Sequence, residues 1–302
     1  MLGYFFRSLA DNRVARAIVA GNPLGRKLSK RFVAGETLDQ AISASRQLAG
    51  QRMKIALAFL GEHVEEEAAA REATDMYIAA ARAVRSAGLP AYLSPKLTQL
   101  GLDIDEEFCR GQLRLILEVC AEEDVFLRVD MEGSPYTETT LKIIEDLHAH
   151  FPKLGTVLQA YLKRTKDDLE RLLGQEIPVR IVKGAYNELA AIAYQSQDEV
   201  EASYRSLVER CLGSGVPCAV ATHNDGLIAH ARQFAMSREV PLENFEFQML
   251  YGIRRSEQDK LAAEGFNVRV YLPFGPQWFP YFMRRLGERP ANAIFLLKNL
   301  FR

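Results

Sequence analysis

The residues of this chain that could do chemistry are mostly cations and hydrogen-bonding groups. Two adjacent arginines, Arg284 and Arg285, follow a tyrosine in the stretch YFMRRLGERP (281–290). Arg180 stands inside a short apolar run, where an arginine is rarely buried without a partner anion. Other polar residues stand at the ends of similar runs: Glu62, Lys96, Asp130, Gln159, Lys183, Thr222 and His223. The basic members of this set predict a site for anions such as a carboxylate or a pyrophosphate.

Other kinds of site find little support. A metal centre is not predicted, because there are only five histidines and neither an HExxH motif nor paired-carboxylate ligand spacing occurs. The GxGxxG and GxxxxGK[ST] motifs are also missing, so a dinucleotide would have to be held by the mouth of the fold itself. With 48% hydrophobic and 25% charged residues and a formal net charge of -1, the composition predicts a globular enzyme with no general attraction to nucleic acid.

The elements that must position these residues repeat one pattern from about residue 54 onward. A short apolar, β-branched run is followed by a longer stretch with helical periodicity. The predicted strands cover 54–61, 91–96, 125–130, 156–160, 179–184, 218–223, 244–250 and 268–275. Eight βα units predict an α/β fold of the closed (β/α)8 TIM-barrel type. An open doubly wound sheet is the alternative, and it would need a topological switch point.

The predicted domains are an N-terminal helical extension, residues 1–50, and the barrel, residues 51–302, whose last helix carries the arginine pair. Predicted barrel helices include 65–88, with Gly88 as a stop signal, and 137–151, whose early Thr and Glu residues suit a first turn. In such a barrel the loops after the strands converge at one face. The polar strand ends are therefore expected to meet there.

The two ends of the chain leave one question open. The segment 1–54 is basic, with Arg7, Arg13, Arg16, Arg26, Lys27, Lys30 and Arg31, which is typical of a solvated helical cap or of an arm for a membrane surface or partner. Four cysteines without CxxC spacing predict reduced structural thiols and a cytoplasmic location. No apolar run reaches the ~18 residues needed to span a bilayer. Peripheral contact of the arm or the tail AIFLLKNLF with the inner face of the membrane stays open.

A series of motifs points to a known family. They are SPKLTQLGLDID (94–105), LRVDME (127–132), LQAYL (158–162), RIVKGAY (180–186), ATHN (221–224), FEFQMLYG (245–252) and VYLPFG followed by YFMRRLGE (270–288). In this order they resemble proline dehydrogenase over nearly the whole barrel, and RIVKGAY with the tyrosine-spaced RRLxE is the most specific part. The resemblance is to the short monofunctional bacterial form, without a half that resembles an aldehyde dehydrogenase.

The resemblance implies an FAD enzyme that oxidises L-proline to 1-pyrroline-5-carboxylate and passes the electrons to a quinone. By motif position, it implies that Lys96, Arg284 and Arg285 hold the proline carboxylate. Asp130 and Arg180 match positions treated as catalytic. The implied flavin-lining residues are Met131, Gln159, Lys183, Gly184, Ala185, Tyr186, Thr222 and His223. Tyr186, Tyr271 and Tyr281 are implied to pack against the proline ring and close the pocket.

The positions of the two arginines on a helix determine how they could contact one carboxylate. Neighbours on a helix point about 100° apart, so Arg284 and Arg285 would approach one carboxylate from two sides. Glu288, at i+4 from Arg284, is expected to brace one of them, and Tyr281 lies one turn earlier.

Three alternative functions remain at this stage. One is another flavin barrel of the same superfamily, similar to methylenetetrahydrofolate reductase. A second is an aldolase in which Lys183 forms a Schiff base. The third is a non-catalytic barrel that binds partners through its basic arm. The sequence does not predict the oligomeric state.

Overall fold

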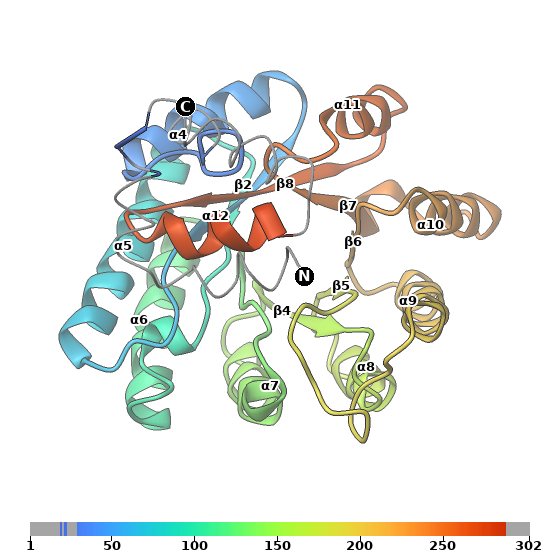
Figure 1. Cartoon of the computed structure of the whole chain (residues 1–302), viewed down its shortest axis with the longest axis horizontal. Helices are drawn as coiled ribbons and strands as arrows, with labels where there is room; N and C mark the ends of the chain where they lie inside the picture. Colours follow the sequence, from blue (N-terminus) through green and yellow to red (C-terminus); the bar gives the residue numbers. More distant parts are fainter. Residues whose placement is uncertain (1–18, 20, 23–28, 288–302) are drawn as a thin grey trace.

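The computed structural model describes residues 19, 21–22 and 29–287, and the element labels are those of Figure 1. In this part of the chain eight parallel strands pair in chain order, and β1 pairs with β8 to close the barrel. The strands are β1 (Lys54–Phe59), β2 (Ala91–Leu93), β3 (Leu127–Arg128), β4 (Leu154–Gln159), β5 (Val179–Val182), β6 (Cys218–Ala221), β7 (Phe245–Leu250) and β8 (Val268–Phe274). The predicted (β/α)8 barrel is confirmed, and the open doubly wound sheet is excluded.

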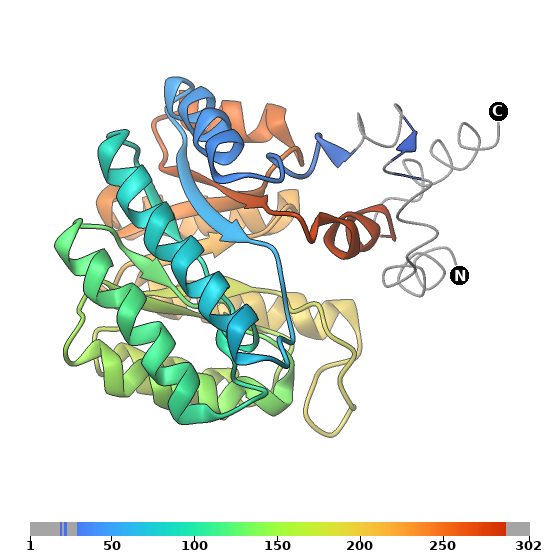
Figure 2. The same cartoon turned by 90° about the vertical axis from the view of Figure 1, so that its left-hand side faces the viewer.

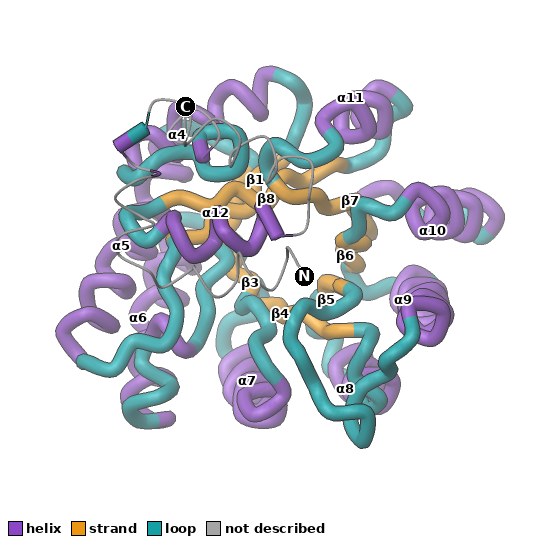
Figure 3. Tube along the Cα trace, in the orientation of Figure 1, coloured by secondary structure: helices purple, strands orange, loops and turns teal. Residues whose placement is uncertain are grey.

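Helices surround the strands on the outside, as the purple and orange tubes of Figure 3 show. They are α4 (Leu38–Gly50), α5 (Glu67–Ser86), α6 (Glu106–Glu122), α7 (Ser134–His148), α8 (Thr165–Leu173), α9 (Gln197–Leu212), α10 (Asp225–Ser237), α11 (Arg255–Ala263) and α12 (Trp278–Gly287). Two short 3₁₀ turns, Thr98–Leu100 and Leu242–Asn244, lie in the connections. Each ring helix brings an apolar face against the strands, which is how the barrel is covered.

Successive side chains of a strand alternate between two environments, as β8 illustrates. Val268, Val270 and Leu272 are fully buried in the main hydrophobic core, whereas Arg269 and Tyr271 between them are less buried and bond to Glu246 of β7 and to Asp130 after β3. Successive side chains of a strand point to opposite faces, so one face packs under the helices and the other lines the barrel interior. Burying each Val or Leu contributes about 1.5–3 kcal/mol. The interior face is left free for polar residues.

Helix α4 lies before the first strand in sequence, yet it packs against both β1 and β8. It therefore covers the place where a helix after β8 would normally complete the ring. Helix α12, which follows β8, is displaced from the ring. Figure 2 shows α12 beyond one end of the barrel, the end toward which the strands run, and Figure 1 shows it crossing the barrel opening.

A second apolar cluster holds α12 in this position. Trp278, Phe279 and Phe282 of the helix cluster with Phe32 and Val33 of the preceding segment. The ring centroids of Phe32 and Phe282 are 6.3 Å apart, which is the range of a favourable aromatic pair. The Trp278 indole N–H also donates to the Glu36 carboxylate at 2.8 Å. The N-terminal segment thus fixes the helix that carries the arginine pair.

Several predicted boundaries were wrong. The regular strands β2, β3, β5 and β6 end earlier than predicted, so Lys96, Asp130, Lys183 and His223 lie in the loops after them. Helix α7 begins at Ser134 and not at 137, because Pro135 supplies a first-turn residue with a fixed backbone angle that suits this position. Gly88 follows α5 with a φ of 60°, as its predicted stop role requires.

Parts of two other predictions fall outside the described residues. Most of the basic arm, Glu288 and the apolar tail belong to the ranges 1–18, 23–28 and 288–302. Within the described part of the chain, no helix combines the length and apolarity needed to cross a membrane. The four cysteines are free and buried, which agrees with the prediction of structural thiols.

Candidate active site

A cavity of about 770 Å³ opens at the carboxyl ends of the strands, beneath α12. Its walls contain every residue that the sequence singled out for a site: Lys96, Asp130, Met131, Gln159, Arg180, Lys183, Gly184, Ala185, Tyr186, Thr222, His223, Tyr271, Tyr281, Arg284 and Arg285. The structure therefore brings the whole set to one place. Which of these residues bind substrate or cofactor stays a prediction.

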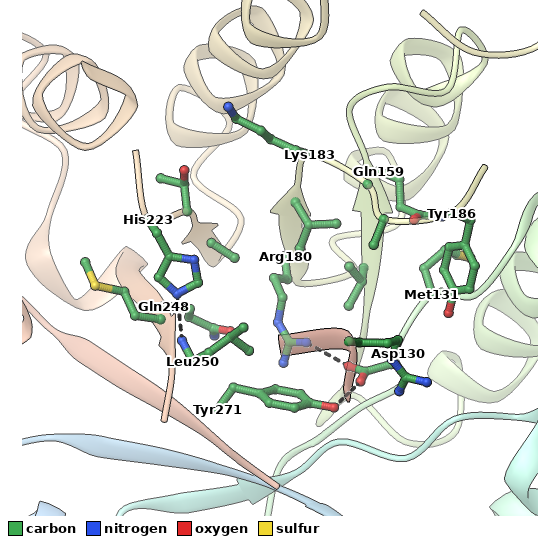
Figure 4. A pocket seen from close by; sticks show the side chains of 18 of the residues that line it. Asp130, Met131, Gln159, Arg180, Lys183, Tyr186, His223, Gln248, Leu250 and Tyr271 are labelled. Atoms are coloured by element: carbon green, nitrogen blue, oxygen red, sulfur yellow. Dashed lines mark hydrogen bonds and ion pairs between the residues drawn. The ribbon is translucent and has the colours of Figure 1, made fainter. Parts of the chain in front are cut away.

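Asp130 is the centre of the polar network in this cavity. One carboxylate oxygen accepts hydrogen bonds from Ser94 Oγ and Arg180 Nη1, each at 2.7 Å. The other accepts from the Tyr271 hydroxyl at 2.7 Å and from Lys96 Nζ at 3.2 Å. Figure 4 shows Asp130, Arg180 and Tyr271 turned toward one another. With four donors on two oxygens, Asp130 is well placed to orient its neighbours.

The charges around Asp130 stabilise one another. Burial alone would raise the pKa of its carboxyl, but Lys96 and Arg180, with hydrogen bonds from Tyr271 and Ser94, hold that pKa below its ordinary value. Burial also disfavours the charged form of Lys96, yet the pKa of Lys96 is raised well above its ordinary value, and the carboxylates of Asp130 and Glu62 act in that direction. Both groups are therefore charged near neutral pH. The pKa of Tyr271 is raised well above its ordinary value by burial and by Asp130, so this phenol keeps its proton.

Arg180 is buried in β5, with 5% of its surface exposed. Besides Asp130, its guanidinium donates to the Tyr92 hydroxyl at 2.8 Å and to Ser94 Oγ at 3.1 Å. It also lies 5.5 Å from the centre of the Tyr271 ring, within the range of a cation–π contact. The partner anion that the sequence required for this arginine is Asp130.

The two arginines of α12 differ in their surroundings. Arg284 Nη2 donates to Glu62 Oε1 at 3.0 Å, and the same oxygen lies 3.7 Å from Lys96 Nζ. The guanidinium of Arg285 lies 5.2 Å from the centre of the Tyr281 ring. Glu288, the expected brace, is outside the described residues. The carboxylate that contacts Arg284 comes from the loop after β1.

Lys183 and Gly184 form a second side of the cavity, at the start of the β5–α9 loop. Lys183 Nζ donates to Glu201 Oε1 at 2.7 Å, and in Figure 4 its side chain extends away from Asp130. A Schiff-base lysine has to reach the substrate, whereas Lys183 Nζ is bonded to Glu201 and extends away from Asp130, so this geometry disfavours the aldolase alternative. Gly184 has a φ of 115°, and a Cβ there would overlap the Tyr161 ring.

His223 and Gln159 are held by the backbone. The Leu250 N–H donates to His223 Nε2 at 3.0 Å, which requires that nitrogen to be unprotonated. Gln159 Nε2 donates to the Glu132 carbonyl at 2.9 Å, and that side chain is almost fully buried. Both side chains are therefore fixed before any ligand binds, which favours precise recognition.

Sequence reasoning gave no site role to several residues of this network. Tyr92 and Ser94 lie in or just after β2 and contact Arg180, and Gln248 of β7 lines the cavity. Ser94 and Gln248 stood inside two of the quoted motifs, and Tyr92 is two residues before Ser94. Their polarity in strands was a usable signal, because a strand interior is otherwise apolar. Glu62 was noticed at a strand end but not linked to Arg284.

Among the described residues, no group of three or more His, Cys, Asp or Glu side chains is placed to hold a metal ion. A closed parallel barrel with charged and hydrogen-bonding residues gathered at the carboxyl ends of its strands is the architecture of a barrel enzyme, with its site at that face. The class is therefore that of the (β/α)8 enzymes.

The particular family follows from comparison with known proteins. The family model described as proline dehydrogenase matches residues 41–298. The chain is 40% identical to proline dehydrogenase 1 of Bacillus subtilis over 304 aligned residues, covering 100% of both chains. It is 38% identical over 280 residues to proline dehydrogenase of Deinococcus radiodurans, covering 91% of this chain and 90% of that one. The chain belongs to the proline dehydrogenase family.

A solved structure agrees with this assignment. The crystal structure of proline utilization A (PutA) from Bdellovibrio bacteriovorus inactivated by N-propargylglycine superposes with a TM-score of 0.82 at 25% identity. The match covers 89% of this chain and 33% of that one, so the chain spans about a third of that longer protein. The shared part is the barrel fold.

Proposed function

We propose that this protein oxidises L-proline to 1-pyrroline-5-carboxylate with FAD as hydride acceptor and passes the electrons to a quinone, as the first step of proline degradation to glutamate. The observation that carries the proposal is the composition of a single cavity. Three cations, Lys96, Arg284 and Arg285, lie on its walls together with hydrogen-bond donors and apolar side chains. Membership of the proline dehydrogenase family supports the choice of substrate.

The three cations suit the carboxylate of an amino acid. Each charge-assisted hydrogen bond to a partly desolvated carboxylate contributes about 1.5–3 kcal/mol. Lys96 approaches from the loop after β2, whereas Arg284 and Arg285 approach from α12, so a carboxylate would be held between two elements. A clamp of this kind fixes the orientation of the substrate ring, which is what a directional transfer requires.

The opposite part of the cavity fits a flavin. Gly184 lines this part of the cavity, and because it lacks a side chain the loop backbone can pack closely against the Tyr161 ring. Gln159, Arg180 and Lys183 supply donors, and Met131, Val157 and Val182 supply apolar surface. These residues, with Ala185, Tyr186, Thr222 and His223, would hold FAD. When bound, FAD would accept the hydride that leaves the proline ring.

The residues of the chain would prepare the substrate for that transfer. Positive charge from Lys96 and the arginine pair favours loss of a proton from the substrate ammonium, because like charge lowers its pKa. Asp130 would orient Lys96 and Arg180 through its four hydrogen bonds. Arg180 would keep a fixed positive charge at the base of the cavity, which favours an electron-rich reduced cofactor. Tyr271 and Tyr281 would pack against the ring and exclude water.

The test begins with the visible spectrum of the purified protein. A flavin spectrum that bleaches without oxygen on addition of L-proline supports the proposal, and a quinone added next should restore the colour. Pyrrolidine, which has the same ring without the carboxylate, serves as the matched control and should bleach far more slowly. A colourless protein that cannot be reconstituted with FAD would contradict the proposal.

A further inference from the structure

Beneath the candidate site, a chain of hydrogen bonds runs through the barrel interior. At its lower end Arg269 Nε donates to Glu246 Oε1 at 2.7 Å, and Gln248 Nε2 donates to the same oxygen at 2.6 Å. Gln248 Nε2 also donates to the Tyr92 hydroxyl at 2.8 Å. Tyr92 is 3% exposed, and Glu246 and Arg269 line a cavity at the opposite end of the barrel from α12.

This series of hydrogen bonds continues from Tyr92 to the candidate active site. Arg180 Nη2 donates to the Tyr92 oxygen at 2.8 Å, and Arg180 Nη1 donates to Asp130 at 2.7 Å. We call the set formed by Arg269, Glu246, Gln248, Tyr92, Arg180 and Asp130 the interior polar chain. Tyr92 is its middle member, and it is the link between the Glu246–Arg269 pair and the Asp130–Arg180 pair.

The Tyr92 oxygen is used as an acceptor by both of these neighbours. A guanidinium can only donate. Gln248 must also present its NH₂ group, because the Glu246 carboxylate that it contacts can only accept. Two N–H groups thus point at one buried phenolic oxygen. Hydrogen bonds of this kind favour the ionised form of the acceptor.

The surrounding charge points the same way. The guanidinium of Arg269 lies 4.1 Å from the centre of the Tyr92 ring, and that of Arg128 lies at 5.7 Å. With Arg180 these make three guanidinium groups from β8, β3 and β5. Two carboxylates, Glu246 and Asp130, contact these guanidinium groups and carry negative charge. Among these five groups the positive charges therefore outnumber the negative charges by one.

We propose that Tyr92 is a positioning residue for Arg180, and that its oxygen serves there as a tyrosinate that balances the third guanidinium of the barrel interior. Burial alone would raise the pKa of Tyr92, but Arg180, Arg128 and Arg269 lower that pKa below its ordinary value, against a smaller opposing effect of Glu246. The lower cavity is also lined by Lys54 of β1, whose positive charge acts in the same sense as the three arginines, and by the carboxylates of Asp124 and Glu243, which act in the opposite sense.

The consequence for the reaction rests on the proposed function. An anion behind Arg180 reduces the positive potential that a flavin in the cavity would experience. Removing that anion should therefore make the reduced flavin more stable and shift its midpoint potential upward. Tyr92 would act through Arg180 and not by contact with the substrate.

The first test needs neither flavin nor proline. Tyr92→Phe keeps the ring that Arg269 and Arg128 face and removes only the oxygen. A pH titration followed by the ultraviolet difference absorption of tyrosinate should show one tyrosine of the wild type ionising at lower pH than the others. That early phase should be absent from Tyr92→Phe. Identical titrations of the two proteins would overturn the proposal, whatever cofactor the protein binds.

The second test measures the midpoint potential of the bound flavin. We expect the midpoint potential to rise in Tyr92→Phe and to stay unchanged in Tyr204→Phe. The control removes a similarly buried hydroxyl from α9, one of the helices that surround the strands. An equal rise in both variants would show general loosening and contradict a role for Tyr92. If Tyr92→Phe fails to fold, Gln248→Leu removes one of the two donors and should move the early tyrosinate phase to higher pH; an unmoved phase would contradict the proposal.

Discussion

Arg284 of α12 donates a hydrogen bond across the barrel opening to Glu62, with 3.0 Å between Nη2 and Oε1. The same carboxylate oxygen lies 3.7 Å from Lys96 Nζ. A carboxylate of the protein itself therefore lies between two of the three cations that are proposed to hold the substrate. A bound proline has to share these cations with Glu62 or displace it, so its affinity is a difference between two sets of contacts.

The arginine pair should control the binding of proline. Arg284→Met and Arg285→Met each remove one charge-assisted hydrogen bond of about 1.5–3 kcal/mol, so KM for L-proline should rise roughly ten- to a hundredfold. Steady-state kinetics with the flavin content checked by absorbance measures this. Arg255→Met, on the exposed side of α11, is the control and should leave KM unchanged. An unchanged KM in both α12 variants would remove the clamp.

Asp130 should matter for stability as well as for turnover. Asp130→Asn leaves the buried Arg180 and the neighbouring Lys96 without their shared anion, and breaking a buried pair typically costs about 3–5 kcal/mol. Urea unfolding should show this loss, with a strong decrease in kcat. Asp168→Asn breaks the pair with Arg164 away from the cavity. That control should lose stability yet keep its KM and most of its kcat, and a comparable loss of kcat would argue against a special role for Asp130.

The same variant predicts a pH dependence. The pKa of Asp130 in the folded protein is lowered, with burial opposing Lys96 and Arg180, whereas an unfolded aspartate titrates near about 3.9. Its stabilising contribution is therefore complete above the unfolded pKa and is lost as pH falls through the folded pKa. The difference in unfolding free energy between wild type and Asp130→Asn should shrink below about pH 4. A difference that stays constant from neutral to acid pH would contradict this assignment.

Gly184 should be intolerant of any side chain. Gly184→Ala adds a Cβ that overlaps the Tyr161 ring, at a residue with a φ of 115°. We expect a loss of at least about 1 kcal/mol in unfolding free energy and weaker binding of FAD, measured by flavin titration. Gly215→Ala also falls at a positive φ, 82°, but in open space. It should show the backbone strain alone, so equal FAD binding by the two variants would argue that the cofactor does not use this loop.

Much of the architecture could be predicted because the barrel repeats one simple pattern. A short apolar run marks each strand, and the polar residues that end the runs, such as Lys96 and Asp130, must meet once the strands are parallel. The position of α12 over the barrel opening could not be predicted in this way. Its anchor, Phe32 against Phe282, joins residues 250 positions apart, and a single sequence carries no signal for such pairs.

The missed contacts share a physical cause. Glu288 was the expected brace for one of the two arginines because i+3 and i+4 spacings are visible in a sequence, whereas Glu62 reaches Arg284 only after the barrel closes. Tyr92 and Gln248 were passed over because the face to which a strand residue points depends on the register of a short strand. β2 has only three regular residues, too few for an alternating pattern to appear.

The interior polar chain also bears on how the molecule assembles. Its members come from β8, β7, β2, β5 and the loop after β3, so neither half of the barrel contains a complete set. A half-barrel would open the interior face to water and lose the hydrogen bonds that Arg180 and Gln248 of one half make with Asp130 and Tyr92 of the other, so each half is less stable alone. Closure of the ring should therefore be an all-or-none event. Separately produced halves, cut between β4 and β5, are expected to remain unfolded until they are mixed.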